Sequence, residues 1–374
     1  MSKLEELIQQ YCPDGVEYKP IGDYLKYEQP TKYLVESTKY DDSYPTPVLT
    51  AGQSFILGYT KETDGIYKAS KDSPVIIFDD FTTSLHWVEF SFKVKSSAMK
   101  MLTPVDETKA LFRYLYYCMK NIMYVPGDHT RQWIGTYSQF EIPIPPLPVQ
   151  EEIVRVVDTF TELQAELQAE LQAELQKRLQ QYNYYRDNLL SFEGRTDVEW
   201  KKLGEVSSVL RGKRLTKSQL SEDGKYKVFH GGIDPIGFFE QYNREGSTTM
   251  VINVGASAGT VGFSKERFWS SDGCFCLSHS SLFSGRYLYY YLQTKEPYLM
   301  SRVRRAGIPT LDGKVLEELL IPVPSLSEQQ RIVDILDKFD ALTTDLTAGL
   351  PAEIEKRRLQ YEYYRDKLLT FKRK

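Results

Sequence analysis

Two regions of the chain carry apolar residues at every third or fourth position. In the first region these residues are Ile153, Val156, Phe160, Leu163 and Leu167, and in the second they are Ile332, Ile335, Phe339, Leu342 and Leu346. Such spacing places the side chains on one face of a helix, as in the seam of a coiled coil. A long helix whose other faces are polar needs a partner to bury this stripe. We therefore expect two similar helical regions that pair in antiparallel fashion, with one globular body near each end.

The rest of the sequence alternates short apolar runs with glycine-rich turns. The runs 74–78 and 250–254 combine β-branched and aromatic residues, which is typical of strands. Helical periodicity appears once in each of these parts, at residues 109–119 and 285–292. The pattern predicts two α+β modules, the first body and the second body.

The chain contains an internal repeat, which indicates two copies of one plan. The matching segments are 142–160 with 321–339 and 177–192 with 356–371, both at an offset of 179, and 16–23 with 198–205 at an offset of 182. The bodies between these segments are dissimilar in sequence. The proline-rich strings 142–148 and 321–324 should end any preceding strand and form stiff entrances to the helices. The predicted divisions are a helical segment 1–15, the first body 16–149, a helical region 150–195, the second body 196–327 and a helical region 328–374.

Residues 162–176 repeat the four-residue unit Glu-Leu-Gln-Ala. Its residues are strong helix formers, but a step of four overshoots one helical turn by about 40°. Each added unit would lengthen the helix by about 6 Å and rotate the residues beyond it. The second helical region instead contains Gly349-Leu350-Pro351, which should either kink the helix or break it into two shorter ones.

Composition limits the function classes. The chain has 374 residues, 41% of them hydrophobic, which suits two packed domains and excludes a disordered protein. The net charge of −4 argues against a protein that binds nucleic acid through overall charge, so any such contact must come from local clusters. No apolar run reaches the roughly 18 residues of a membrane span, and we expect a cytoplasmic protein with no membrane partner.

The search for catalytic or metal sites is largely negative. The four cysteines, Cys12, Cys118, Cys274 and Cys276, are expected to be reduced thiols, since their spacing with His279 completes no usual zinc site. Asp79-Asp80 and His86 are interpreted as a turn and a surface histidine rather than a metal site. Neither an amino-methyltransferase motif nor a phosphate loop occurs, and no metal or cofactor is predicted.

One alternative enzyme motif is present. Gly255-Ala-Ser-Ala-Gly259 follows an apolar run and has the form of a nucleophile elbow, so a serine hydrolase acting through Ser257 stays open. A glycine-rich hairpin loop is the favoured interpretation, because His279 follows too soon for the usual order of catalytic residues. A coiled-coil scaffold that binds no DNA is the other alternative.

Long basic and amide side chains are the candidates for nucleic-acid contact, since they read base edges and phosphates. The candidate DNA-binding residues are Lys61, Lys68, Lys71, His129, Arg131 and Gln132 in the first body, and Arg211, Lys213, Arg214, Lys217, Arg302, Arg304 and Arg305 in the second. Trp133 is expected to be a core residue.

The ordered set of features resembles the specificity subunit of type I restriction-modification enzymes. The features are two dissimilar bodies, two similar helical regions ending in YYRDxLLxF, a proline-rich entrance, a four-residue repeat, and the segments 12–18 and 90–100. The match covers nearly the whole chain. The resemblance implies an α+β protein with two target recognition domains, separated by two long antiparallel helical regions and related by an internal pseudo-twofold repeat.

The resemblance also implies a subunit without catalysis. Each body would read one half of a bipartite target in double-stranded DNA, and the number of four-residue units would set the spacer. The helical regions would dock two adenine-N6 methyltransferase subunits, and ATP-dependent restriction subunits would join them. The repeated residues expected to share docking with core packing are Tyr182, Tyr185, Arg186, Tyr361, Tyr364 and Arg365.

Overall fold

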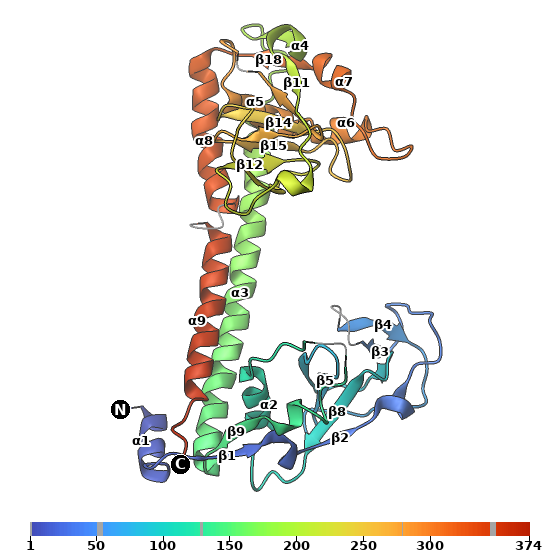
Figure 1. The fold of residues 1–374 in the computed structure, drawn as a ribbon, viewed down its shortest axis with the longest axis vertical. Helices are drawn as coiled ribbons and strands as arrows, with labels where there is room; N and C mark the ends of the chain where they lie inside the picture. Colours follow the sequence, from blue (N-terminus) through green and yellow to red (C-terminus); the bar gives the residue numbers. More distant parts are fainter. Residues whose placement is uncertain (1, 51–54, 128–129, 279, 345–348) are drawn as a thin grey trace. The chain divides into compact units, whose positions relative to one another are not determined.

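The computed structural model describes residues 2–50, 55–127, 130–278, 280–344 and 349–374. The chain forms two compact units (Figure 1). Unit 1 comprises residues 1–168 and 356–374, and unit 2 comprises residues 169–355. Each unit therefore combines one body with helical residues that pack on it.

The strands of unit 1 form three small sheets. They are β1 (Glu17–Pro20), β2 (Leu25–Glu28), β3 (Thr46–Leu49), β4 (Ile56–Thr60), β5 (Val75–Asp79), β6 (Leu85–Val88), β7 (Lys93–Val94), β8 (Met99–Pro104) and β9 (Glu141–Ile144). The sheets have the orders β2-β8-β5-β6, β4-β3-β7 and β1-β9. β5 is buried along its whole length, which confirms the strand predicted from residues 74–78.

The helices of unit 1 cover the four-stranded sheet and continue into the helical region. They are α1 (Lys3–Tyr11), α2 (Phe112–Asn121), the first part of α3 (Leu147–Leu189) and most of α9 (Leu350–Leu368), with short 3-10 helices at Ile21–Asp23, Pro30–Tyr33 and Tyr137–Gln139. α2 confirms the helix predicted over 109–119. Residues from α2, from the first turns of α3 and from β5 and β8 share one hydrophobic core.

Unit 2 repeats this topology although its body differs in sequence. Its strands are β10 (Glu199–Lys202), β11 (Val209–Arg211), β12 (Tyr226–Phe229), β13 (Gly237–Phe239), β14 (Thr248–Ile252), β15 (Val261–Ser264), β16 (Trp269–Ser270), β17 (Cys274–Leu277) and β18 (Leu320–Val323). The sheet orders are β11-β17-β14-β15, β13-β12-β16 and β10-β18. They correspond strand for strand to those of unit 1, including one parallel pair in each three-stranded sheet.

The helices of unit 2 follow the same arrangement. They are α4 (Leu203–Val206), α5 (Gly285–Thr294), α6 (Glu296–Ser301), α7 (Gly313–Glu317), α8 (Leu326–Thr344) and the second part of α3, with a 3-10 helix at Lys217–Gln219. α5 confirms the helix predicted over 285–292. It packs between the four-stranded sheet and α8, and these elements share a second core. Together these elements give the predicted α+β class.

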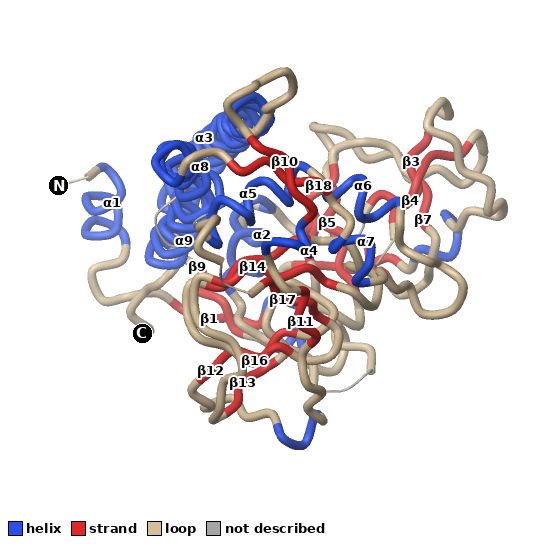
Figure 2. Tube along the Cα trace, turned by 90° about the horizontal axis from the view of Figure 1, so that it is seen from above, coloured by secondary structure: helices blue, strands red, loops and turns tan. Residues whose placement is uncertain are grey.

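The helical regions are continuous in one copy and divided in the other. α3 runs without interruption through the Glu-Leu-Gln-Ala repeat for 43 residues. The second region is split, because α8 ends at Thr344 and α9 begins at Leu350, beside Pro351. Within unit 1, α9 runs antiparallel to α3, and both views show the two side by side (Figures 1 and 2). The division into two helices is confirmed, although Leu350 and Pro351 belong to the first turn of α9.

The apolar seam is more open than its spacing predicts. Ile153 and Val157 are buried against the core of the first body, where the sequence favoured Val156 over Val157. Further along α3, Phe160 and Leu163 are 41% and 55% exposed. The first turns of α3 pack against the core of the body. Further along, a repeat of four residues rotates the apolar stripe around the helix, so its side chains do not all face one partner helix.

The proline-rich strings end strands as expected, since β9 stops before Pro145 and β18 before Pro324, but the first residues of each string belong to the strand. Pro143 lies within β9 and Pro322 within β18. Each strand belongs to a two-stranded ribbon, so the proline can face the edge that needs no backbone donor. The carbonyl groups of these prolines accept hydrogen bonds from Tyr114 at 2.9 Å and Tyr287 at 3.3 Å.

Equivalent contacts attach each body to the helix that follows it, α3 in unit 1 and α8 in unit 2. We call the helical regions that begin with these helices the tails. In unit 1 the side chain of Gln150 accepts from the backbone N–H of Leu111 at 2.9 Å and donates to Pro145. In unit 2 Gln329 accepts from the N–H of Ser284 at 3.1 Å and donates to Pro324 at 3.0 Å. Gln150 and Gln329 are fully buried at matching repeat positions, so their amides cap the start of α2 and α5.

A charged contact completes each attachment, and we call it the clamp. In unit 1 Arg113 contacts Asp158 at 2.9 Å, and Tyr117 donates to the same carboxylate. In unit 2 Arg286 contacts Asp337 and Asp340, both at 2.6 Å.

The clamp of unit 2 also contains a tyrosine, Tyr290, which donates to Asp337 at 2.5 Å. Burial, followed by these hydrogen bonds to carboxylates, raises the pKa of Tyr117 and of Tyr290. Both phenols therefore stay protonated donors at neutral pH.

Candidate nucleic-acid interface

Three candidate arginines that are distant in sequence line one pocket of unit 2. Arg211 ends β11, whereas Arg302 and Arg304 follow α6. They border a pocket of about 420 Å³. Its other lining residues are Asn253, Phe275, Thr310, Leu311, Asp312 and Gly313. The sequence singled out both basic clusters but gave no sign that they meet.

The loop that carries Arg304 is held by backbone hydrogen bonds. Arg304 and Thr310 bond to each other through both N–H groups, at 2.9 and 3.1 Å. Below this pair, the carbonyl of Pro309 accepts from the N–H of Gly255, and that of Asn253 accepts from Leu311. Gly307 has a φ of 81°, which closes the turn at little steric cost. This framework fixes the directions in which the arginines leave the body.

The basic residues of this face lack acidic partners. Arg211, Lys213, Arg214, Lys217, Arg302, Arg304 and Arg305 are all exposed. Among the described residues, none of them forms an ion pair with a carboxylate, whereas Arg113, Arg267, Arg286 and Arg331 each do. An unneutralised cluster in an acidic chain is the arrangement expected for phosphate or base-edge contact.

An amide lies at the base of the same pocket. Asn253 is only 2% exposed, and its Oδ1 accepts no hydrogen bond from any described residue. Asp312 also borders the pocket, but its carboxylate caps α7 by accepting from the N–H of Lys314 at 3.0 Å. The pocket thus offers cationic groups at its rim and an unused polar atom at its base.

The corresponding part of the first body has a different chemistry. A pocket of about 500 Å³ lies beside β2, the counterpart of β11. Its lining residues are Pro20, Gly22, Asp23, Leu25, Lys26, Tyr27, Trp133, Ile134, Ser138 and Gln139. Tyr27 and Ile134 are 42% and 60% exposed. The first pocket is therefore mixed, with exposed aromatic and aliphatic groups beside the cation Lys26, where the second is rich in arginine.

The first-body candidates lie in separate segments of the described chain. Lys61, Lys68 and Lys71 are exposed in the segment that joins β4 to β5. Arg131 is half-exposed and lies 3.6 Å from the buried carboxylate of Asp80. His129 lies outside the described residues.

Gln132 and Trp133 are core residues of this segment. Gln132 is 2% exposed and its side chain bonds to Tyr124 and Thr130. Because this leaves no surface for a base, the sequence-based assignment of Gln132 to base reading is not retained. Trp133 is buried, as expected, and its backbone N–H donates to Asp80 at 2.8 Å. Asp80 also pairs with buried Lys100 at 3.2 Å, so this ion pair holds the segment that carries Arg131.

The suspected metal residues serve structural roles. Asp79 accepts from the N–H of Phe81 at 2.9 Å and from the hydroxyl of Thr82 at 2.6 Å, which confirms the predicted turn. His86 stacks on Phe55 with ring centroids 3.8 Å apart, and burial lowers its pKa. Within the described ranges no cluster of histidine, cysteine and acidic side chains could hold a metal ion. The four cysteines are free and buried.

The geometry does not support the hydrolase alternative. Ser257 lies in a turn that joins the antiparallel strands β14 and β15, with Gly255 and Gly259 both at positive φ. A nucleophile elbow instead leads from a strand into a helix. His279, its only candidate base, lies outside the described residues. The favoured interpretation as a hairpin loop is confirmed.

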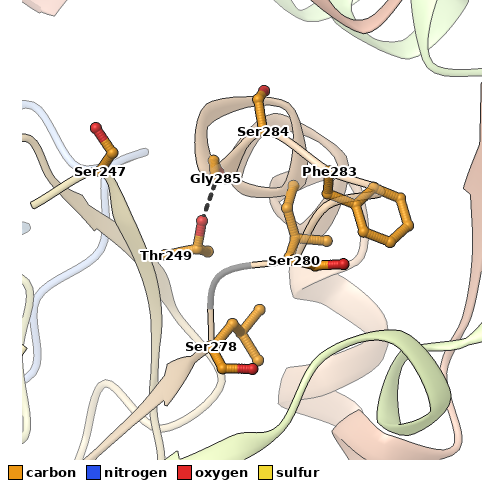
Figure 3. Close-up of a pocket in the computed structure, with 9 residues that line it drawn as sticks. Ser247, Thr249, Ser278, Ser280, Phe283, Ser284 and Gly285 are labelled. Carbon is orange, nitrogen blue, oxygen red and sulfur yellow. Dashed lines mark hydrogen bonds between the residues drawn. The ribbon is translucent and has the colours of Figure 1, made fainter. Parts of the chain in front are cut away.

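A second hollow of the body lies at the start of α5. Figure 3 shows serine and threonine side chains around it, among them Ser247, Thr249 and Ser284. The hydroxyl of Thr249 donates to the carbonyl of Gly285 at 2.7 Å, which ties β14 to α5. The described residues that line this hollow of about 290 Å³ are uncharged.

The repeated tyrosines of the tails separate into two groups. Tyr182 is buried and donates to Gln293, and its counterpart Tyr361 bonds to Thr161. Arg186 and Arg365 are largely covered and pair with the neighbouring aspartates Asp187 and Asp366. These four residues, at two repeated positions, therefore form contacts within their own unit.

The other repeated tyrosines are exposed. Tyr184 and Tyr185 are 66% and 40% exposed, and Tyr363 and Tyr364 are 62% and 45% exposed. Each pair forms an edge-to-face contact, with ring centroids 5.6 and 5.4 Å apart. We call these the tyrosine pairs. Tyr364 also borders a groove of about 290 Å³ between α3 and α9 in unit 1.

None of the helices among the described residues is both long and apolar enough to cross a membrane.

Comparison with known proteins places these features in one family. The model of the type I restriction modification DNA specificity domain matches residues 13–177 and again residues 196–356. The specificity subunit of the type I restriction enzyme EcoR124I/EcoR124II from Escherichia coli is 44% identical, over 99% of this chain and 97% of that protein. The EcoprrI specificity subunit, also from Escherichia coli, is 31% identical over 64% of this chain and 63% of its own length.

Solved structures agree in fold. A chain from a study of complex assembly and conformational transition of the type I R-M system aligns with a TM-score of 0.64 at 18% identity, covering 96% of this chain and 98% of that one. The S subunit of a type I restriction-modification system from M. genitalium aligns with a TM-score of 0.53 at 18% identity, covering 96% and 97%. From the two domain matches and the full-length relative, the chain belongs to the specificity subunits of type I restriction-modification systems.

Proposed function

We propose that this chain is the DNA-reading, non-catalytic subunit of a type I restriction-modification complex, and that each body reads one half of a bipartite site. The observation that carries the proposal is the duplicated topology with different pockets at equivalent strands. Two similar frameworks with unlike surfaces suit two half-sites of unlike sequence. The unpaired arginines of the second body support contact with phosphates and guanine edges.

The partners follow from the repeated surfaces of the tails. Two modification subunits, which carry the adenine methylation, would dock on the tyrosine pairs, because exposed tyrosines at equivalent positions can hold two identical partners. Restriction subunits, which are ATP-dependent translocases and nucleases, would join this assembly. The chain itself would need no cofactor, and the complex would act in the cytoplasm.

The Glu-Leu-Gln-Ala repeat would set the spacer between the two half-sites. α3 contributes residues to both units and is helical throughout the repeat. Each unit adds about 6 Å of helix, whereas one base pair occupies roughly 3.4 Å of DNA. One unit therefore corresponds to about one or two base pairs.

Deletion of residues 166–169 tests this function directly. The variant would be assembled with its modification subunits, and methylated sites would be mapped by sequencing. We expect both half-sites to keep their sequences while the gap between them shortens by one or two base pairs. The matched control replaces Gln168 and Gln172 by alanine, which keeps the helix length and should keep the gap. An unchanged gap in the deletion variant would refute the role of the repeat.

A further inference from the structure

An isoleucine occupies the most exposed part of the arginine-bearing loop. Ile308 is 70% exposed and lies between Arg305 and Thr310, in the loop that follows α6 and projects from the second body (Figure 1). Burying such a branched apolar side chain is favourable, so a partner that covers this loop tip would gain binding energy from it. The first body shows a similar combination, since Met123 and Val125 are 98% and 88% exposed shortly before Arg131.

Hydrogen bonds of neighbouring residues fix the backbone position of Ile308. The hydroxyl of Thr310 donates to the carbonyl of Ile308 at 2.9 Å. The two-way backbone pair of Arg304 with Thr310 closes the loop just behind it. The side chain therefore projects from a braced turn, beside a pocket lined by Arg302 and Arg304. A preorganised contact of this kind loses little conformational freedom on binding.

The surrounding charge identifies the occupant as DNA. Arg302, Arg304 and Arg305 have no carboxylate partner among the described residues, which suits a polyanion and opposes the binding of a basic or purely apolar surface. Within the major groove, the group that an aliphatic side chain recognises is the C5-methyl of thymine. We infer that Ile308 is a specificity-determining residue that contacts a thymine methyl group in the half-site read by the second body. This inference rests on the proposed function.

The test removes the methyl group from DNA and its partner from the protein. The complete complex with modification subunits would be titrated with the bipartite duplex, in which each thymine of that half-site is replaced in turn by deoxyuridine. The half-site would first be assigned by mapping the methylation of a variant with Arg302 and Arg304 replaced by alanine. Wild-type affinity should fall about fourfold at one position, as expected for the loss of one buried methyl group.

The protein variants define the coupling. Ile308→Ala should weaken binding to the thymine duplex by a similar factor and should be insensitive to deoxyuridine at that position. Ile308→Val, which keeps a branched side chain, should retain most of the sensitivity. Ile236→Ala is the matched control, because Ile236 is 46% exposed in the same body but belongs to the segment between β12 and β13.

The outcomes separate this inference from the proposed function. If the wild-type complex recognises its bipartite site but no thymine shows coupling to Ile308, or if that half-site contains no thymine, the inference is overturned while the proposed function stands. If the wild-type complex shows no preference for any bipartite site, the proposed function itself fails. Thermal unfolding of each variant guards against misfolding, since a folded Ile308→Ala variant with unchanged affinity and unchanged thymine dependence also overturns the inference.

Discussion

The two bodies are alike where they meet their tails and unlike where they face outward. Gln150 and Gln329 make the same contacts, and a clamp of arginine, tyrosine and aspartate occurs in both units. The pockets beside β2 and β11, by contrast, differ in balance, since three arginines line the second where, among the described residues, a single lysine lines the first. Attachment and reading therefore rest on separate residues, so that a body can change its surface without loosening its hold on the helix.

The largest expected effect concerns the outward faces. Replacing Arg211, Arg302 and Arg304 by alanine should weaken DNA binding by the assembled complex at least about 100-fold, taking roughly 1 kcal/mol for each lost contact. The slope of log affinity against log salt should fall by about 3. Fluorescence anisotropy over a salt series measures both quantities. The matched triple in the first body, Lys61, Lys68 and Lys71 to alanine, should cost less, because no described pocket brings these residues together; equal losses would contradict the contrast between the faces.

The clamps should differ in strength although they match in kind. Arg286 is 14% exposed and holds two carboxylates, whereas Arg113 is 29% exposed and holds one. We expect Arg286→Met to lower the free energy of unfolding by about 2 kcal/mol and Arg113→Met by about 1 kcal/mol, since each change leaves partly exposed carboxylates without their arginine. Denaturant unfolding of the free chain measures both. Arg267→Met, which breaks an exposed pair with Glu245, is the control and should change little.

The tyrosine pairs should give the most symmetrical effect. Replacing Tyr184 and Tyr185 by serine should weaken binding of one modification subunit by about 2 kcal/mol, and the same change at Tyr363 and Tyr364 should weaken the other equally. Analytical ultracentrifugation would then show one bound partner rather than two for each double variant. Tyr182→Phe, which alters a buried tyrosine, should leave assembly intact. Loss of both partners from one double variant would argue against two independent docking surfaces.

Local patterns were sufficient to predict the elements of secondary structure. The helical periods of α2, α5 and the two helical regions, the division of the second region into α8 and α9, and the buried strand β5 all follow from neighbouring residues. The repeat offset of 179 likewise pointed to two related units. Each of these features depends on residues within one or two turns or strands, which a single sequence records.

Contacts between distant segments could not be predicted in the same way. Arg211 meets Arg302 only because β11 and the loop after α6 border one pocket. Gln132 has an amide side chain of the kind that reads base edges, yet Tyr124 and the backbone around Asp80 bury it. The shared topology of the bodies was also hidden, since different apolar residues can fill the same sheet order. Which repeated tyrosines of the tails are buried and which are exposed depends on helix packing, which the sequence does not record.

The division of the chain into units has a consequence for its synthesis. Unit 2 is continuous in sequence, but unit 1 needs residues 356–374, which include the backbone bonds between Val16 and Lys372 at 2.9 Å and between Val16 and Lys374 at 3.0 Å. The ribosome adds the 187 intervening residues of unit 2 in about 10–40 s at ordinary elongation rates. During that interval the first body lacks residues 356–374, and the face of α3 that later packs against α9 is open to solvent. A chaperone that binds apolar surface would have access to this face.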